Sequence, residues 1–137
     1  MTRLAELRAL QVLNEAGLPR PLRLVRASSV TNEVWLTDEL VIRINRRVDT
    51  RLHRESTLAE WLPPELGYPE VVAYGGRPGS DWLIVRRLPG TVLSRCWPSM
   101  SVDERRDAVR QLADKLRVLH ATPTPPDLPS LDAPQLL

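Results

Sequence analysis

The chain has 137 residues, enough for one domain with its own core, and its 42% hydrophobic and 26% charged residues are typical of a globular protein. Its net charge of +2 comes from 19 basic and 17 acidic residues spread along the chain, which argues against binding to nucleic acid or to a membrane surface. Cys96 is the only cysteine, which excludes an internal disulfide and suits the reducing cytoplasm, and neither a signal peptide nor a membrane-spanning apolar run is visible.

The first part of the chain predicts a helix, three strands and a second helix. Leucines recur at every third position from Leu4 to Leu13 before Gly17 and Pro19, so a helix is expected over residues 3–16. Alternating residues predict strands over 21–27, 34–36 and 40–45, separated by polar turns at 28–32 and 37–38. Asp49 or Thr50 can cap the second helix, which the prolines at 63 and 64 stop.

The second part predicts a hairpin and a long helix. Strands are expected over 71–74 and 81–87, joined by a glycine-rich turn at 75–79, and Pro89-Gly90 breaks the second strand. Ser101 and Glu104 form a capping box at the start of a helix whose apolar face runs from Val109 to Leu119. Proline is frequent after that helix, so residues 122–137 are expected to be extended or disordered.

Together these elements predict an α+β fold. Five short strands with a helix inserted after the third favour a five-stranded antiparallel sheet with one helix packed against it. An N-terminal helix and a long C-terminal helix complete the architecture.

The third predicted strand and the helix after it carry the most informative pattern. Alternation places Val41 and Arg43 on one face of the strand, and Glu55 lies on the apolar stripe of the helix. A carboxylate on such a stripe is costly to bury without a cation. We therefore expect Arg43 and Glu55 to pair across the interface between sheet and helix, although an ordinary surface pair is the alternative.

Several local patterns occur in an order that is similar to a known family. They are Ser28-Ser-Val-Thr-Asn32, Val41-Ile-Arg43-Ile, Arg54-Glu55, Ile84-Val-Arg-Arg-Leu-Pro-Gly90 and Arg117-Val-Leu-His120-Ala. From about Leu22 to His120 the chain resembles the N-terminal lobe of the aminoglycoside phosphotransferase and choline kinase-like family, a protein-kinase-like lobe. The resemblance implies a nucleotide-binding lobe at 1–88, a hinge and first helix of a C-terminal lobe at 89–121, and a proline-rich tail at 122–137.

The resemblance also implies roles for individual residues. Arg43 stands where the family holds the basic residue that contacts the nucleotide phosphates, usually lysine, and Glu55 would orient it. Ser28, Ser29, Thr31 and Asn32 would form the loop over the phosphates, but the loop has no glycine, and a plain polar turn is an equal alternative.

The strand end at Val85, Arg86 and Arg87 would be the hinge that holds an adenine edge through its backbone, while Val41 covers the face of the base. A simple strand end is the alternative. The resemblance also implies that the chain binds ATP or GTP together with Mg²⁺. His53 and His120 have no acidic neighbours at metal spacing, so each is interpreted as a surface or packing residue.

The catalytic part of the family has no match in this sequence. A His-x-Asp motif with a downstream Asn, and then a second Asp, would supply the base and the magnesium ligands, but His120 is followed by Ala121-Thr122. We therefore expect a truncated lobe that is inactive alone, with the phosphate acceptor bound elsewhere. The alternative is a non-catalytic interaction domain, marked by an exposed apolar face on the helix at 101–120.

Overall fold

The structure, a computed structural model, describes residues 2–29 and 31–130. Its strands and longer helices are α1 (Thr2–Glu15), β1 (Val25–Ala27), β2 (Asn32–Leu36), β3 (Leu40–Asn45), α2 (Arg51–Trp61), β4 (Val71–Gly75), β5 (Trp82–Arg86) and α4 (Val102–Ala121). Three short turns of helix complete it: η1 (Pro64–Leu66), α3 (Leu93–Cys96) and η2 (Trp97–Ser99). In this described part, no helix is both long enough and apolar enough to cross a membrane.

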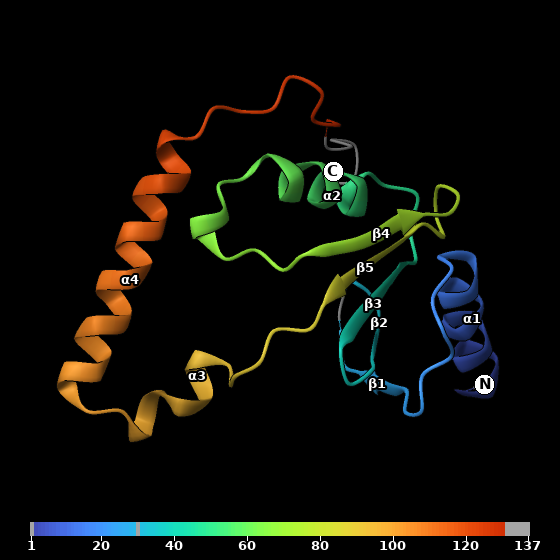
Figure 1. Cartoon of the computed structure of the whole chain (residues 1–137), viewed down its shortest axis with the longest axis horizontal. Helices are drawn as coiled ribbons and strands as arrows, with labels where there is room; N and C mark the ends of the chain where they lie inside the picture. Colours follow the sequence, from blue (N-terminus) through green and yellow to red (C-terminus); the bar gives the residue numbers. More distant parts are fainter. Residues whose placement is uncertain (1, 30, 131–137) are drawn as a thin grey trace.

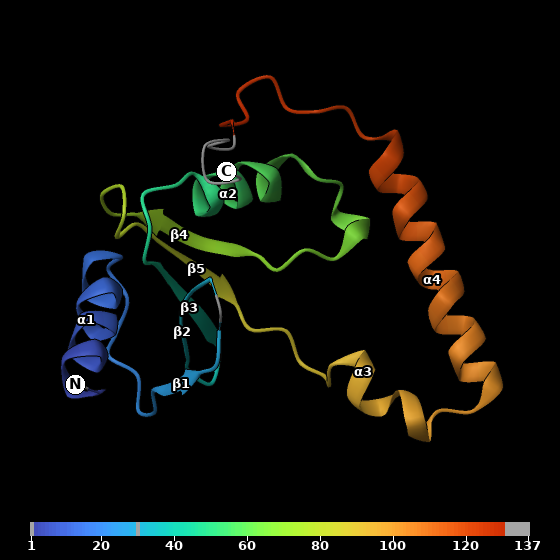
Figure 2. The same cartoon turned by 180° about the vertical axis from the view of Figure 1, so that it is seen from behind.

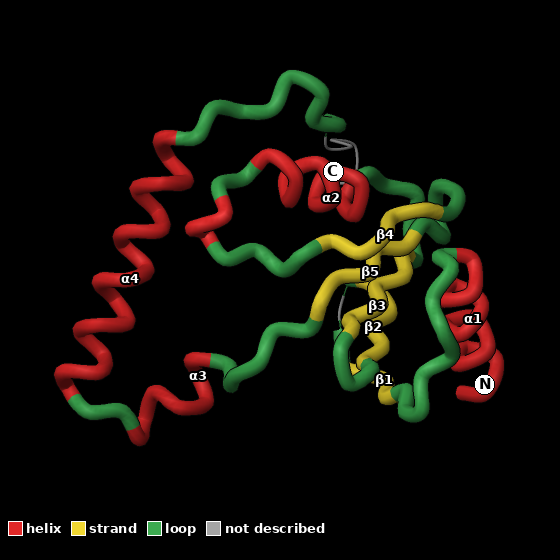
Figure 3. The backbone as a smooth tube through the Cα atoms, viewed as in Figure 1, coloured by secondary structure: helices red, strands yellow, loops and turns green. Residues whose placement is uncertain are grey.

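The five strands form one antiparallel sheet in the order β1-β2-β3-β5-β4, as Figures 1 and 3 show. β3 lies at the centre and pairs with β2 on one side and with β5 on the other. The predicted α+β fold with a five-stranded antiparallel sheet is therefore confirmed.

The two faces of the sheet are covered by different helices. On one face Ile42 and Ile44 pack with Ala9, Val12 and Leu13 of α1. On the other face Leu52 of α2 packs with Leu83 and Val85, which alternate along β5 with residues of the first face. The sequence predicted one helix against the sheet, whereas the structure places α1 and α2 on opposite sides of it (Figures 1 and 2).

The side of α1 that faces the sheet differs from the row of leucines at every third position. Leu4 and Leu7 are 70% and 53% exposed, whereas Ala9 and Leu13 are 0% and 1% exposed. A spacing of three residues falls short of a helical turn by about 60° at each step, so such a row winds around the helix instead of following one side. The small Ala9 lies within the buried stripe and lets the helix approach the strands.

The connection from α1 to β1 is irregular. Gly17, with a φ of 74°, ends the helix in a Schellman motif, in which Gly17 N–H and Leu18 N–H donate to Asn14 O and Leu13 O at 3.0 and 2.9 Å. The first strand is shorter than the predicted 21–27 and begins only at Val25. Val25 lies opposite Leu36, the last residue of β2, so the residues before Val25 have no strand to pair with.

A buried carboxylate joins α1 to the sheet. Glu33 of β2 accepts hydrogen bonds from Arg8 Nη2 at 2.8 Å and from Trp35 Nε1 at 2.9 Å, and Arg26 lies 3.8 Å away. Burial acts to raise the pKa of Glu33, but these donors and the charges of Arg8 and Arg26 outweigh it, so its pKa lies below the usual value. Glu33 is therefore ionised at neutral pH and holds α1 in place.

The segment after β5 leads away from the sheet to α4 (Figure 1). The predicted capping box is confirmed: Ser101 Oγ accepts from Glu104 N at 3.1 Å, and Glu104 Oε1 accepts from Ser101 N at 2.8 Å. The short helices α3 and η2 were not predicted. The apolar side of α4 lies open, since Val109 and Leu112 are both 56% exposed and Leu116 and Leu119 both 42%.

Residues 122–130 return from α4 to α2 without forming a helix or strand. Trp61 Nε1 donates to Pro123 O at 2.6 Å, Thr50 Oγ1 donates to Ser130 O at 2.6 Å, and Arg54 also bonds to Pro129 O. This part of the tail thus forms neither helix nor strand and is held against α2 by hydrogen bonds. The rest of the predicted tail, 131–137, lies outside the described residues.

Candidate functional site

The predicted pairing of Arg43 with Glu55 is confirmed. Arg43 Nη2 donates to Glu55 Oε1 at 3.0 Å, and Nη1 donates to Oε2, so the guanidinium grips the carboxylate with two parallel hydrogen bonds. The two side chains are 24% and 32% exposed, which leaves the pair open to solvent on one side. The pair is held in place by the packing of α2 on β3, because Leu52 of α2 and Val41 of β3 belong to one apolar cluster.

Tyr68 belongs to the same cluster of polar groups, although sequence reasoning missed it. Its hydroxyl donates to Glu55 Oε2 at 3.3 Å. Burial and the negative charge of Glu55 raise the pKa of Tyr68 to about 12, so the phenol stays protonated and remains a donor. Tyr68 lies in the irregular connection between η1 and β4, where no periodic pattern could have revealed which way it points.

Apolar side chains surround Arg43 on its face of the sheet. Val34 is directly opposite Arg43 in the ladder, and Leu36 is opposite Val41. Val85 of β5 lies on the other side of Val41. The sequence analysis named Val41 and Val85 but not their neighbours Val34 and Leu36. The short turn at 37–39 fixes the register of β2 against β3, so that turn was the signal that could have found them.

The predicted phosphate loop is only partly brought to this face. Ser28, Ser29 and Thr31 are exposed, whereas Asn32 is buried at the start of β2, two residues before Val34 and on the same side of the strand. Ser28 and Ser29 line a hollow of about 400 Å³ together with Arg26, Ala27 and Arg46. In the described part of the chain, the hydrogen bonds of Arg43 go to Glu55 and none joins these serines to it.

The predicted hinge has backbone bonds that sequence could not reveal. Arg86 N–H donates to Glu70 O and Arg87 N–H donates to Glu39 O, each at 2.8 Å. The Arg87 guanidinium also donates to Thr37 O at 3.0 Å, so this end of β5 is fixed to the turn between β2 and β3. The next amide, that of Leu88, has no backbone acceptor among the residues the structure describes.

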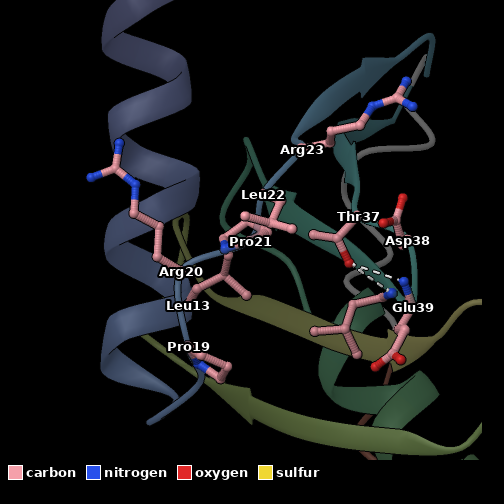
Figure 4. A pocket seen from close by; sticks show the side chains of 10 residues that line it. Leu13, Pro19, Arg20, Pro21, Leu22, Arg23, Thr37, Asp38 and Glu39 are labelled. Carbon is pink, nitrogen blue, oxygen red and sulfur yellow. Dashed lines mark hydrogen bonds between the residues drawn. The ribbon is translucent and has the colours of Figure 1, made fainter.

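A cavity of about 220 Å³ lies on the opposite face of the sheet (Figure 4). Leu13 and Leu40 contribute to its walls, and both belong to the core on the α1 side. Charges of both signs surround it, from Arg20, Arg23, Asp38 and Glu39. It is therefore separate from the site around Arg43.

Comparison with known proteins gives one match at the level of a family. A model described as the phosphotransferase enzyme family matches residues 23–136. No curated protein and no solved structure matches the chain. The matched segment begins just before β1 and includes the whole sheet, the Arg43–Glu55 pair and α4. The resemblance inferred from the sequence motifs is thus confirmed, and the chain belongs to the phosphotransferase enzyme family.

Proposed function

We propose that this chain is the ATP-binding lobe of a small-molecule phosphotransferase of the aminoglycoside type. The observation that carries the proposal is the two-fold hydrogen bond between Arg43 and Glu55, open to solvent on one side. A guanidinium has five N–H donors. Glu55 takes two of them, which leaves three for phosphate oxygens of ATP or GTP bound with Mg²⁺.

The nucleotide base has a matching surface beside this pair. Leu36, Val41 and Val85 are neighbours on the same face of the sheet, and their apolar side chains suit one side of a purine ring. Beyond Val85, the carbonyl group of Arg86 and the amide of Leu88 would hold the edge of the base, since the amides of Arg86 and Arg87 are already used within the fold. Arg87 would fix the hinge through Thr37.

The loop from Ser28 to Asn32 would cover the phosphates. Hydroxyl groups of Ser28, Ser29 and Thr31 replace the glycine amides that usually approach phosphate. Arg26 and Arg46 also line the hollow beside Ser28 and Ser29, and both carry positive charge that would favour an anion.

Thermal unfolding with increasing MgATP tests the proposal. A ligand at 100 times its dissociation constant stabilises the folded state by about 2.7 kcal/mol, which is a measurable rise in Tm. MgGTP in a parallel titration shows whether the hinge prefers adenine. No rise in Tm at millimolar nucleotide, with either base, would contradict nucleotide binding.

A pair of variants at Leu88 tests the hinge. Leu88→Pro removes the amide hydrogen, and Leu88→Ala keeps it while shortening a side chain that is 56% exposed. We expect the proline variant to bind MgATP about 3 to 10 times more weakly than the alanine variant, because one hydrogen bond contributes roughly 0.5–1.5 kcal/mol. Isothermal titration calorimetry measures the ratio. Equal dissociation constants would place the base elsewhere.

Phosphoryl transfer needs groups that these residues do not contain, above all a His-x-Asp motif. The lobe is therefore expected to bind nucleotide but to be inactive alone, in a reducing cytoplasm that suits its single cysteine. In this proposal residues 1–88 are the nucleotide lobe and 89–121 begin a second lobe. The acceptor, a hydroxyl compound, would bind to that second lobe.

The exposed side of α4 favours an additional contact. Val109, Leu112, Leu116 and Leu119 form an open apolar row that a C-terminal lobe or a partner chain would cover. The same row supports the second candidate, a kinase-like interaction domain without catalytic activity. The nucleotide titration separates the two, because an interaction domain that has lost its ligand would unfold at the same temperature with or without MgATP.

A further inference from the structure

A second cavity, separate from the proposed nucleotide site, is lined by a buried carboxylate that lacks a hydrogen-bond partner within the described residues. It has a volume of about 320 Å³ and lies where α2 begins, beside the β4–β5 hairpin. Its lining residues are Val48, Asp49, Thr50, His53, Tyr74, Gly76, Pro78 and Asp81. Two of these residues are acidic, and in the described chain no lysine or arginine lines it.

Asp81 is the centre of this cavity. Asp81 is only 3% exposed, yet its Oδ1 atom has no hydrogen-bond partner among the described residues. The other oxygen, Oδ2, accepts from the Tyr74 hydroxyl at 2.9 Å. Because Tyr74 also lines the cavity, this contact places the carboxylate at its wall. Leaving a buried carboxylate oxygen without a hydrogen-bond donor costs free energy, so a ligand that donates a hydrogen bond would be favoured here.

The surroundings of Asp81 limit where that donor can come from. Burial first, and then the hydrogen bond to Asp81 and its charge, raise the pKa of Tyr74 to about 12, so the phenol stays protonated and its one hydrogen is used on Oδ2. Asn45 donates its side-chain N–H to Asp49 Oδ1 at 2.7 Å, and the Thr50 hydroxyl donates to Ser130 O. Arg51 lies 3.9 Å from Asp49 Oδ2 and is 56% exposed, so it pairs with Asp49 and does not line the cavity.

We propose that this cavity binds a small organic cation, a primary ammonium group on a short carbon chain, with the ammonium group beside the carboxylate of Asp81. Asp49 adds negative charge at the same wall. The hydroxyl oxygens of Thr50 and Tyr74 keep lone pairs that can accept N–H groups of the cation. The rings of His53 and Tyr74 are stacked with centroids 5.3 Å apart, and with Val48 and Pro78 they offer a surface for the carbon chain and the charge.

A metal ion fits this cavity less well than an ammonium group. Within the described ranges, no group of three or more His, Cys, Asp or Glu side chains is arranged to hold one. Calcium and magnesium need six or more oxygen ligands in a defined geometry. An ammonium group needs only a few acceptors, and its carbon chain fills the apolar part of the cavity.

Propylammonium chloride is a direct probe. We expect it to bind to the wild-type chain with a dissociation constant of about 1–10 mM, and to shift the NMR signals of the His53 and Tyr74 rings. Potassium chloride at equal ionic strength controls for a bare cation, and 1-propanol controls for the carbon chain. Saturable ring shifts with propylammonium alone support the proposal. No saturable shift, or equal shifts with either control, would overturn it.

Two variants locate the binding. Asp81→Asn keeps the size of the side chain and removes its charge, so we expect propylammonium to bind at least 10 times more weakly. Asp38→Asn makes the same change on the exposed turn between β2 and β3 and is expected to leave the dissociation constant unchanged. Retained binding in Asp81→Asn would overturn the assignment. If that variant does not fold, Asp49→Asn replaces it, and we then expect a loss of about 3-fold, with unchanged binding again counting against the proposal.

Discussion

Replacing Arg43 with alanine is expected to weaken MgATP binding about 10–150-fold, because hydrogen bonds to charged groups contribute roughly 1.5–3 kcal/mol. In the proposed site the variant would remove the three N–H donors that Glu55 leaves free for phosphate, and it would also leave the carboxylate of Glu55 near the phosphates without its partner. Isothermal titration calorimetry with MgATP measures the change.

Further variants separate the role of the positive charge of Arg43 from that of its planar guanidinium group. Arg43→Lys keeps the positive charge but loses the planar pair of donors, so its affinity should lie between those of wild type and Arg43→Ala. Glu55→Gln keeps the shape of its side chain and weakens the grip on Arg43, with an expected loss of about 3- to 10-fold in affinity. Arg110→Ala, at a 72% exposed position on α4, is the matched control and should bind like wild type.

Stability shows whether a loss of binding is specific. The Arg43–Glu55 pair is partly exposed, and pairs of this kind contribute about 0–1 kcal/mol to folding. Arg43→Ala should therefore unfold within a few degrees of wild type. If it folds normally and binds MgATP as tightly as wild type does, Arg43 does not contact the phosphates and the nucleotide proposal fails.

The central pair was predictable because both of its members follow local periodicity. Alternation along β3 placed Arg43 on the face opposite Ile42 and Ile44, and helical spacing placed Glu55 on the stripe that contains Leu52. Once α2 packs on this face of the sheet through Leu52, the two charges meet.

Other parts of the site depend on contacts that sequence periodicity does not contain. The backbone amide of Arg86 donates to the carbonyl oxygen of Glu70. Glu70 is distant in sequence and becomes a neighbour only because β4 pairs with β5. Tyr68 points to Glu55 from an irregular segment. Whether an oxygen of Asp81 has a hydrogen-bond partner depends on which side chains surround it in the fold. The residues next to Asp81 in sequence therefore do not reveal that its Oδ1 atom lacks one in the described part of the chain.

The packing of α1 is the clearest case in which periodicity and structure disagree, and a matched pair of variants on this helix tests it. Leu13→Ala is expected to destabilise the fold by about 2–5 kcal/mol, because the side chain is 1% exposed within the core and its loss leaves a cavity. Leu4→Ala, the same change at a 70% exposed position, should alter stability by less than about 0.5 kcal/mol.

Urea unfolding followed by circular dichroism measures both variants, and Leu7→Ala, at 53% exposure, is a second control on the exposed side. Helix propensity cannot produce the difference, since the same two residue types are exchanged at each position and differ little in propensity. Only burial against the sheet separates Leu13 from Leu4 and Leu7. Similar losses at Leu4 and Leu13 would mean that α1 lies on the sheet with the whole row of leucines inward, which is incompatible with Ala9 and Val12 in the core.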